Sequence, residues 1–134
     1  MFTYISGGTL QSHNFPNKYP NNQDETYNVE VQTGKTIEII FETFELEVSN
    51  LNCIINITVY WWKAHSRCSY DWLKIMDGST TLLEETCGSN VPTKLLSQTN
   101  KVEIIFHTDF SVTKRGFKLQ WKASIESKWT GYYK

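Results

Sequence analysis

The stretch Ile37-Glu38-Ile39-Ile40-Phe41-Glu42 places an apolar side chain at every second position. Successive side chains of a β-strand point to opposite faces, so Ile37, Ile39 and Phe41 would share one face of such a strand. The other face would be mostly polar. This alternation is typical of an antiparallel sheet that packs on a core with one face and meets water with the other. The stretch therefore predicts a half-buried β-strand.

The same alternation recurs on both sides of this stretch. Residues 27–31 and 117–122 each carry apolar side chains at every second position, and residues 73–76 and 102–106 form shorter, more apolar runs. No stretch has a convincing amphipathic helical pattern, so we expect an all-β chain with strands at the intervals of a sandwich. Turn sequences separate the runs: Pro20-Asn21-Asn22, Thr33-Gly34-Lys35, Asp77-Gly78-Ser79 and Gly88-Ser89-Asn90.

Length and composition indicate one compact globular domain. The chain has 134 residues, 14% aromatic residues and three prolines, which excludes a disordered or collagen-like chain. The formal net charge of −1 suggests neither nucleic acid nor an anionic membrane as a bulk partner. No apolar run approaches membrane-spanning length. Residues 1–4 lack the features of a signal peptide, so for a secreted protein we expect Met1 to be an expression start or the chain to be a mature fragment.

Three acidic residues stand beside aromatic or aliphatic residues that we expect to be buried. The pairs are Leu46-Glu47, Tyr70-Asp71 and Asp109-Phe110. A buried neighbour fixes the direction of a carboxylate, and Ca²⁺ takes several oxygen ligands in irregular geometry. The three acids are therefore a candidate calcium site. The alternative is that they are ordinary solvated surface acids.

A set of short motifs follows in a fixed order along the chain: Gly7-Gly8-Thr9-Leu10, residues 12–22, Phe41–Glu47, Cys68-Ser69-Tyr70-Asp71, Asp77-Gly78, Cys87-Gly88, His107–Ser111 and Gly116-Phe117. This ordered set resembles the CUB domain, an extracellular β-sandwich used for protein recognition. The resemblance ends near Ala123 and is greatest to the first CUB domains of the complement initiating proteases. It implies a single jelly-roll-type antiparallel β-sandwich over residues 1–125.

The resemblance also implies how the cysteines are used. Cys68 and Cys87 stand at the positions of the family's second disulfide. The first disulfide is missing, because Ser6 and Glu25 occupy its positions. The fold should tolerate this loss, with the amino-terminal segment held only by packing.

In calcium-binding members of the family, the residues that match Glu47, Asp71 and Asp109 coordinate the ion. The loop carrying Ser111 and Val112 would add backbone oxygens, and Tyr19 matches a tyrosine that supports the site by hydrogen bonding. The resemblance further implies that the same acidic residues accept a Lys or Arg side chain from an extracellular protein partner. We therefore expect a non-enzymatic, calcium-dependent recognition module, secreted or in the extracellular part of a larger protein.

Residues at about 49–67 form an insertion relative to the family pattern. The insertion contains the unpaired Cys53, the N-glycosylation sequon that begins at Asn56, and the pair Trp61-Trp62. One interpretation is an added strand or hairpin that packs on its own domain. The other, which we adopt as a prediction, is an interaction element in which Cys53 forms an intermolecular disulfide or is buried by a partner. The competing outcome is a pairing of Cys53 with Cys87, which would leave Cys68 free. A homodimer formed through the insertion or through Cys53 is a further alternative.

Other functions fit the sequence less well. Cys53, His65, Cys68 and Cys87 could form a zinc site, but only in a reducing compartment. A serine hydrolase would need a Gly-x-Ser-x-Gly motif on a βαβ scaffold, and neither is visible. Within the family, the alternatives are a carbohydrate-binding or adhesive secreted protein of the seminal-plasma (spermadhesin) type and a purely structural module of a larger protease or receptor. Residues 126–134 lie beyond the family core and form an extension, an assembly tail or an expression remnant.

Overall fold

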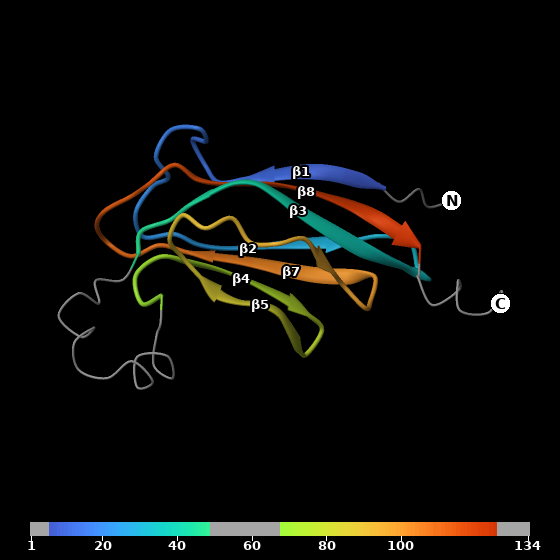
Figure 1. The fold of residues 1–134 in the computed structure, drawn as a ribbon. Helices are drawn as coiled ribbons and strands as arrows, with labels where there is room; N and C mark the ends of the chain where they lie inside the picture. Colours follow the sequence, from blue (N-terminus) through green and yellow to red (C-terminus); the bar gives the residue numbers. More distant parts are fainter. Residues whose placement is uncertain (1–5, 49–67, 126–134) are drawn as a thin grey trace.

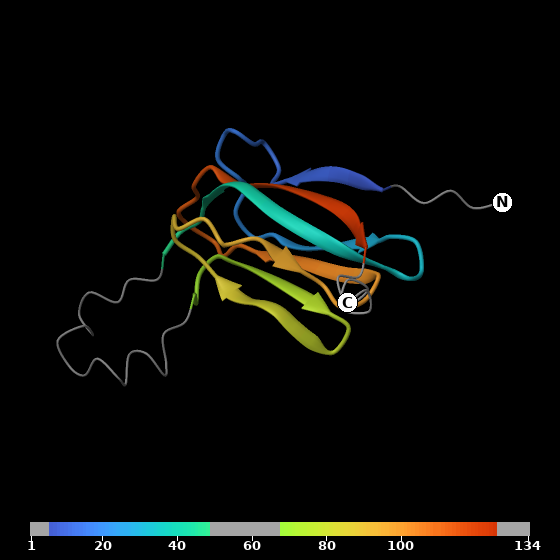
Figure 2. The ribbon, with the colours of Figure 1, turned by 45° about the vertical axis from the view of Figure 1, so that its right-hand side comes forward.

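The protein is a sandwich of two antiparallel β-sheets, shown by a computed structural model that describes residues 6–48 and 68–125 (Figure 1). One sheet has the strand order β1-β8-β3-β6 and the other β2-β7-β4-β5. A second view shows the two layers facing one another along their length (Figure 2). The strands are β1 (Gly7–Gln11), β2 (Asp24–Glu30), β3 (Lys35–Glu45), β4 (Trp72–Asp77), β5 (Thr80–Thr86), β6 (Leu95–Leu96), β7 (Lys101–His107) and β8 (Gly116–Ile125). The expected all-β sandwich is confirmed.

The core lies between the sheets and consists of the side chains that the alternation placed on one face. On β3, Ile37 and Ile39 have no exposed surface, while Ile40 between Ile39 and Phe41 is 41% exposed. Each fully buried side chain of this size stabilises the fold by about 1.5–3 kcal/mol. The buried hydrophobic residues are Tyr19, Val29, Val31, Ile37, Ile39, Phe41, Phe44, Leu46, Leu73, Ile75, Val102, Ile104, Phe106, Phe117 and Leu119.

A β-bulge in β3 changes which residues face the core. The pairing of β3 with β8 shifts between Phe41 and Thr43, so the buried series moves from odd to even positions, Phe44 and Leu46. The rings of Phe41 and Phe44 therefore both lie in the core, 5.8 Å apart and nearly perpendicular. Without the extra residue, the period of two would turn Thr43 and Glu45 inward instead. The bulge thus buries Leu46 directly before Glu47.

A disulfide and a short backbone bridge secure this end of β3. Cys68 and Cys87 are bonded, as the resemblance implied. Next to Cys87, Gly88 exchanges two backbone hydrogen bonds with Leu46, with N···O distances of 2.9 and 3.2 Å. The disulfide links the chain before β4 to the end of β5, so β3, β4 and β5 are tied together where Glu47 and Asp71 emerge. Cys87 is also partly buried against the core.

The amino-terminal segment is held by more than the expected packing. β1 pairs with β8 along its whole length, and the Ala123 N–H donates a hydrogen bond to the Ser6 carbonyl oxygen over 2.8 Å. Glu25 forms an ion pair with His13, with Nε2 3.6 Å from Oε2. This pair contributes little stability because the His13 side chain is 54% exposed. The strand pairing with β8 is therefore the main substitute for the absent disulfide.

Gly116 begins β8 at a point where the chain has no room for a side chain. Its φ is +95°, and a Cβ there would collide with Ser12 Oγ and contact the ring of Tyr19. Ser12 is buried, and its Oγ accepts a hydrogen bond from the Phe117 N–H over 3.1 Å. Gly116 therefore allows three segments to meet behind Tyr19.

In the described part of the chain, no helix is long and apolar enough to cross a membrane.

We predict that Gly116→Ala destabilises the protein by about 2–5 kcal/mol, because it adds overpacking against Ser12 to the strain of a left-handed backbone. Gly34→Ala is the matched control, since Gly34 also has a φ of +95° but nothing lies within 4 Å of its added Cβ. It should cost only about 1–2 kcal/mol. Urea unfolding of the two variants measures the difference, and equal losses would show that crowding at Gly116 is unimportant.

Candidate metal-binding site

Three carboxylates meet at one end of the sandwich. Glu47 follows β3, Asp71 precedes β4, and Asp109 lies in the loop between β7 and β8. Each residue offers one carboxylate oxygen to the site, and these three oxygens lie within 4.8 Å of one another. The structure therefore brings together the three acids that the sequence analysis nominated as ligands.

Asp71 is completely buried, and both of its oxygens accept hydrogen bonds. The Tyr19 hydroxyl donates to Oδ2 over 2.6 Å, and the Asp109 N–H donates to Oδ1 over 2.8 Å. Tyr19 is itself 1% exposed, and its ring packs edge-on against Phe106 at 5.2 Å. Burial raises the pKa of Asp71, although these two hydrogen bonds oppose that rise by favouring the charged form.

Tyr19 also holds the chain that carries Glu47. The Glu47 N–H donates a hydrogen bond to the Tyr19 hydroxyl oxygen over 3.1 Å. That hydroxyl therefore accepts from one acidic residue and donates to another, with a ring anchored in the core. Burial of the phenol and its hydrogen bond to Asp71 raise the pKa of Tyr19, so the hydroxyl stays protonated as a donor.

Glu47 has a carboxylate oxygen that lacks a partner. Its Oε1 is buried and forms no hydrogen bond in the described part of the chain. Burial, followed by repulsion from Asp109 and Asp71, raises the pKa of Glu47 to about 7, while Lys114 acts in the opposite direction. An unsatisfied buried acceptor beside two other carboxylates is a costly arrangement unless a proton or a cation joins it. The three acids therefore fit a hard cation such as Ca²⁺, which prefers oxygen ligands.

A network of hydrogen bonds around Thr108 positions the Asp109 loop. Thr108 is 1% exposed, and its Oγ1 donates to the Pro20 carbonyl oxygen over 3.0 Å and accepts from the Gln23 N–H over 2.8 Å. Asp109 adds two contacts: its carbonyl oxygen accepts from the Asn22 N–H, and its Oδ1 accepts from the Ser111 N–H. No pattern in the sequence pointed to Thr108. Its burial could not be seen from a short side chain in a turn-rich stretch.

Two of the expected aromatic anchors are not buried as predicted. Phe110 is 79% exposed, and Tyr70 is only partly buried. The anchors of these acids are other residues: the Tyr19 hydroxyl bonds to Asp71, and Thr108, next to Asp109, bonds to the Pro20 carbonyl oxygen. Only the expectation for Leu46, which is 2% exposed, is confirmed.

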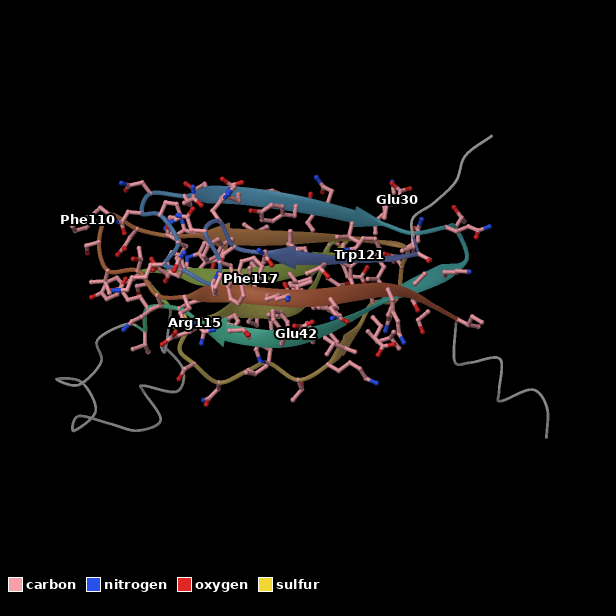
Figure 3. All side chains as sticks on the ribbon, turned by 90° about the horizontal axis from the view of Figure 1, so that it is seen from above. Glu30, Glu42, Phe110, Arg115, Phe117 and Trp121 are labelled. Atoms are coloured by element: carbon pink, nitrogen blue, oxygen red, sulfur yellow. A yellow bond between two sulfur atoms is a disulfide. The ribbon has the colours of Figure 1, made fainter. Side chains whose placement is uncertain are left out.

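Exposed apolar side chains adjoin two of the carboxylates in the sequence. Val48 directly follows Glu47, Phe110 directly follows Asp109, and Val112 lies in the same loop as Phe110. Val48 is 61% exposed, Phe110 79% and Val112 52% (Phe110 is labelled in Figure 3). Val112 has a φ of +60°, which is unusual for a β-branched residue and costs free energy. We call Val48, Phe110 and Val112 the apolar rim.

Several sequence predictions lie outside the described residues or are excluded by the structure. Cys53, Asn56, Trp61 and Trp62 belong to residues 49–67, which the structure does not describe. The zinc hypothesis is wrong for Cys68 and Cys87, because their sulfurs are bonded to one another. The same bond excludes a pairing of Cys53 with Cys87. The two described histidines contact acids: His13 pairs with Glu25, and His107 Nδ1 lies 2.6 Å from Asp24 Oδ1.

Comparisons with known proteins agree with the fold and the motifs. A family model described as "CUB domain" matches residues 3–121. The chain is 36% identical over 117 residues to neuropilin-2 of Rattus norvegicus, covering 85% of this chain and only 12% of the length of neuropilin-2. Among solved structures, the human MASP-1/3 CUB1-EGF-CUB2 domains match with a TM-score of 0.75 and 29% identity, over 90% of this chain and 40% of that one. A MASP-1 CUB2 domain bound to Ca²⁺ matches with a TM-score of 0.73 and 27% identity, over 89% of this chain and 94% of that one.

We predict that in the presence of chelator the protein becomes less stable as the pH rises. The ordinary pKa of Glu47 is 4.5, and in the folded state it is raised to about 7. Between these values the folded state keeps a proton that the unfolded state loses, so the free energy of unfolding falls as the pH rises through this window. Melting temperatures from about pH 5 to about pH 8 measure the effect. Glu47→Gln should flatten the profile, and identical profiles for wild type and variant would contradict the assignment to Glu47.

We predict that Tyr19→Phe keeps the fold but lowers calcium affinity about 10–100-fold, because the residues that orient metal ligands typically contribute this much. The variant keeps the buried ring and removes only the hydroxyl that contacts Asp71 and the Glu47 N–H. Tyr27→Phe is the matched control, since Tyr27 lies on β2 and packs against the core away from the three acids. Isothermal titration with CaCl₂ compares the two variants. Equal affinities for both would show that Tyr19 has only a packing role.

Proposed function

Because this chain belongs to the CUB domain family, we propose that it is a calcium-dependent protein-recognition module of an extracellular protein. CUB domains are generally non-catalytic interaction modules, and they occur in extracellular or secreted parts of larger proteins. The chain spans only a small part of its curated relatives, so the module would act within a larger secreted or receptor protein.

The observation that carries the proposal is the unpartnered Oε1 of Glu47, which is buried beside Asp71 and Asp109. Glu47, Asp71 and Asp109 would hold Ca²⁺ with their side chains, and Ser111 and Val112 would add backbone oxygens. When bound, the ion supplies the positive charge that three neighbouring carboxylates otherwise lack. Tyr19 would orient two of these residues from behind, through the hydrogen bonds to Asp71 Oδ2 and from the Glu47 N–H.

The surface around the acids suits a basic side chain from a protein partner. Carboxylate oxygens that remain accessible would accept charge-assisted hydrogen bonds from a Lys ammonium or an Arg guanidinium. Both side chains carry an aliphatic stem that can lie against apolar groups. The apolar rim of Val48, Phe110 and Val112 offers such groups directly beside the acids. The contact is small, so we expect several copies of the module to act together on one partner.

Three further predictions concern residues 49–67 and 126–134, which lie outside the described residues. Asn56 remains a predicted glycosylation site. Cys53, Trp61 and Trp62 remain a predicted interface that could join two copies of the chain or contact another protein. The division into a domain of residues 1–125, an insertion at about 49–67 and an extension of residues 126–134 is likewise a prediction.

We predict that CaCl₂ raises the melting temperature relative to chelator, because the ion neutralises three carboxylates that repel one another in the folded state. Asp109→Ala should abolish most of this rise, since it removes one of the three carboxylates. Glu84→Ala, at an exposed acid on β5, is the matched control and should keep the full rise. A melting temperature that is the same in calcium and chelator would show that the acids are ordinary surface charges.

Whether the module binds a basic side chain is tested by a second measurement. Immobilised lysine-containing peptides should retain the protein in CaCl₂ and release it in chelator, and the same peptides with acetylated lysine should not retain it. A glycan array under the same two conditions tests the carbohydrate-binding alternative. Calcium binding without peptide binding would leave the ion site intact and reject a basic side chain as the ligand.

A further inference from the structure

Several acids on the outer faces of the two sheets are matched within the fold. On β3, Glu38 pairs with Lys94 and Lys122, at 3.5 and 3.9 Å, and Glu42 contacts Lys118 and Gln120. On the other sheet, Asp24 of β2 pairs with His107 of β7.

On the other sheet, four polar side chains line a pocket without such partners. Asn28 and Glu30 come from β2, and Lys101 and Glu103 come from β7. Asn28 stands opposite Glu103 and Glu30 opposite Lys101 in the strand register. Within residues 6–48 and 68–125, no hydrogen bond or ion pair engages these four side chains. Unlike Asp24, Glu38 and Glu42, the two acids of this pocket are therefore not matched by a neighbouring side chain of the described residues.

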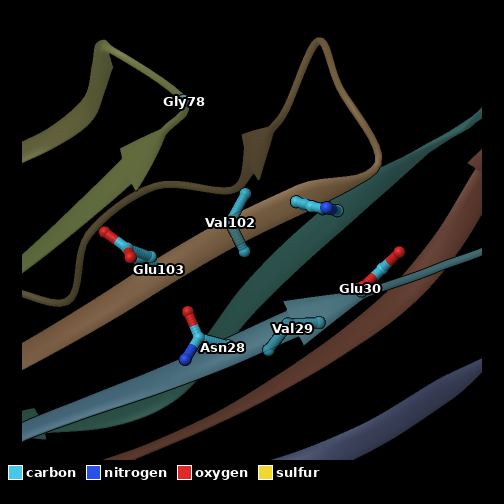
Figure 4. A pocket seen from close by; sticks show the side chains of 7 residues that line it. Asn28, Val29, Glu30, Gly78, Val102 and Glu103 are labelled. Atoms are coloured by element: carbon cyan, nitrogen blue, oxygen red, sulfur yellow. The ribbon is translucent and has the colours of Figure 1, made fainter.

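The pocket has a volume of about 260 Å³. Figure 4 shows Asn28 and Glu103 side by side on neighbouring strands, with Gly78 in the turn that follows β4. Gly78 has no side chain to fill the space, and the sheet backbone around Val29 and Val102 completes the lining. The pocket is large enough for one amino-acid side chain with a planar polar group.

We propose that this pocket binds a guanidinium group, that of an arginine side chain. Two carboxylates and one ammonium give the pocket a net negative charge, so a cation is the favoured ligand. The planar guanidinium presents several N–H donors in a fixed arrangement, which suits carboxylates and an amide oxygen better than the single ammonium of lysine does. Glu103 and Glu30 would accept the charge-assisted hydrogen bonds, and Asn28 would add its side-chain carbonyl oxygen.

This site is separate from the calcium site. Figure 3 shows Glu30 and Phe110 at opposite ends of the sandwich. Glu103 lies on β7 and Asp109 follows the end of that strand, six positions later, which corresponds to roughly 20 Å of extended chain. Arginine binding in the pocket should therefore persist in chelator. A failure of the calcium proposal would leave this inference intact, and the reverse also holds.

The test is an NMR titration of ¹⁵N-labelled protein in chelator with N-acetyl-arginine amide, which mimics arginine within a chain. We expect saturable shifts confined to the amides around the pocket, with a dissociation constant on the order of a millimolar. A second titration with free arginine tests whether the ligand is the free amino acid or an arginine side chain of a protein. For a protein side chain, N-acetyl-arginine amide should bind at least as tightly as free arginine. N-acetyl-lysine amide in a third arm should bind more weakly. No shift at tens of millimolar ligand, or equal binding of an N-acetylated glutamate amide, would overturn the proposal.

Asn28→Lys provides a sharper variant than removal of a carboxylate. The new ammonium would stand opposite Glu103 and occupy the pocket from within, and cross-strand opposite charges also stabilise a sheet. Arginine binding should fall at least tenfold while the melting temperature is kept or raised. Glu84→Lys, at an exposed position on β5, is the matched control and should leave arginine binding within about twofold of wild type. If Asn28→Lys bound arginine as well as wild type, the pocket would not be the site.

Discussion

The hydroxyl group of Tyr19 links the core of this protein to its candidate metal site. Its ring is buried against Phe106, and its oxygen contacts both Asp71 and the backbone of Glu47. Two acidic residues that lie 24 positions apart in the sequence are thereby held by one atom. The ring can take this position only because Gly116 leaves space beside it. The packing of the core and the geometry of the candidate site therefore both depend on Tyr19. A substitution that moves its ring would also move the hydroxyl that contacts Asp71 and Glu47.

The bulge in β3 has a comparable influence on the candidate site. It buries Phe44 and Leu46 after a series of buried odd-numbered residues, and so it determines where Glu47 leaves the sheet. The disulfide and the bridge between Leu46 and Gly88 secure the same region. Glu47 is thus brought to the other acids by rigid elements.

The two ends of the sandwich offer different chemistry. One end combines a cluster of one buried and two half-buried carboxylates with the exposed apolar rim, an arrangement that suits a cation and a protein surface. The other end has a mixed-charge pocket of exposed side chains on β2 and β7, which favours a single cationic group. The pocket includes Lys101 and Glu103 of β7, while Asp109 lies in the loop after that strand, so the two sites share no residues.

The sequence by itself determined the class of the fold, five of the eight described strands (β2, β3, β4, β7 and β8) and the candidate ligands. Alternation is local, so Ile37, Ile39 and Phe41 could be assigned to one face, and the ordered motifs identified Cys68, Cys87 and the three acids. Tertiary structure decided the rest: that Thr108 is buried and Phe110 exposed, that Glu47 Oε1 lacks a partner, and that Asn28 stands opposite Glu103. These facts depend on bulges, strand register and the packing of segments distant in sequence. No local pattern encodes them, because each arises from which other segment occupies the neighbouring space.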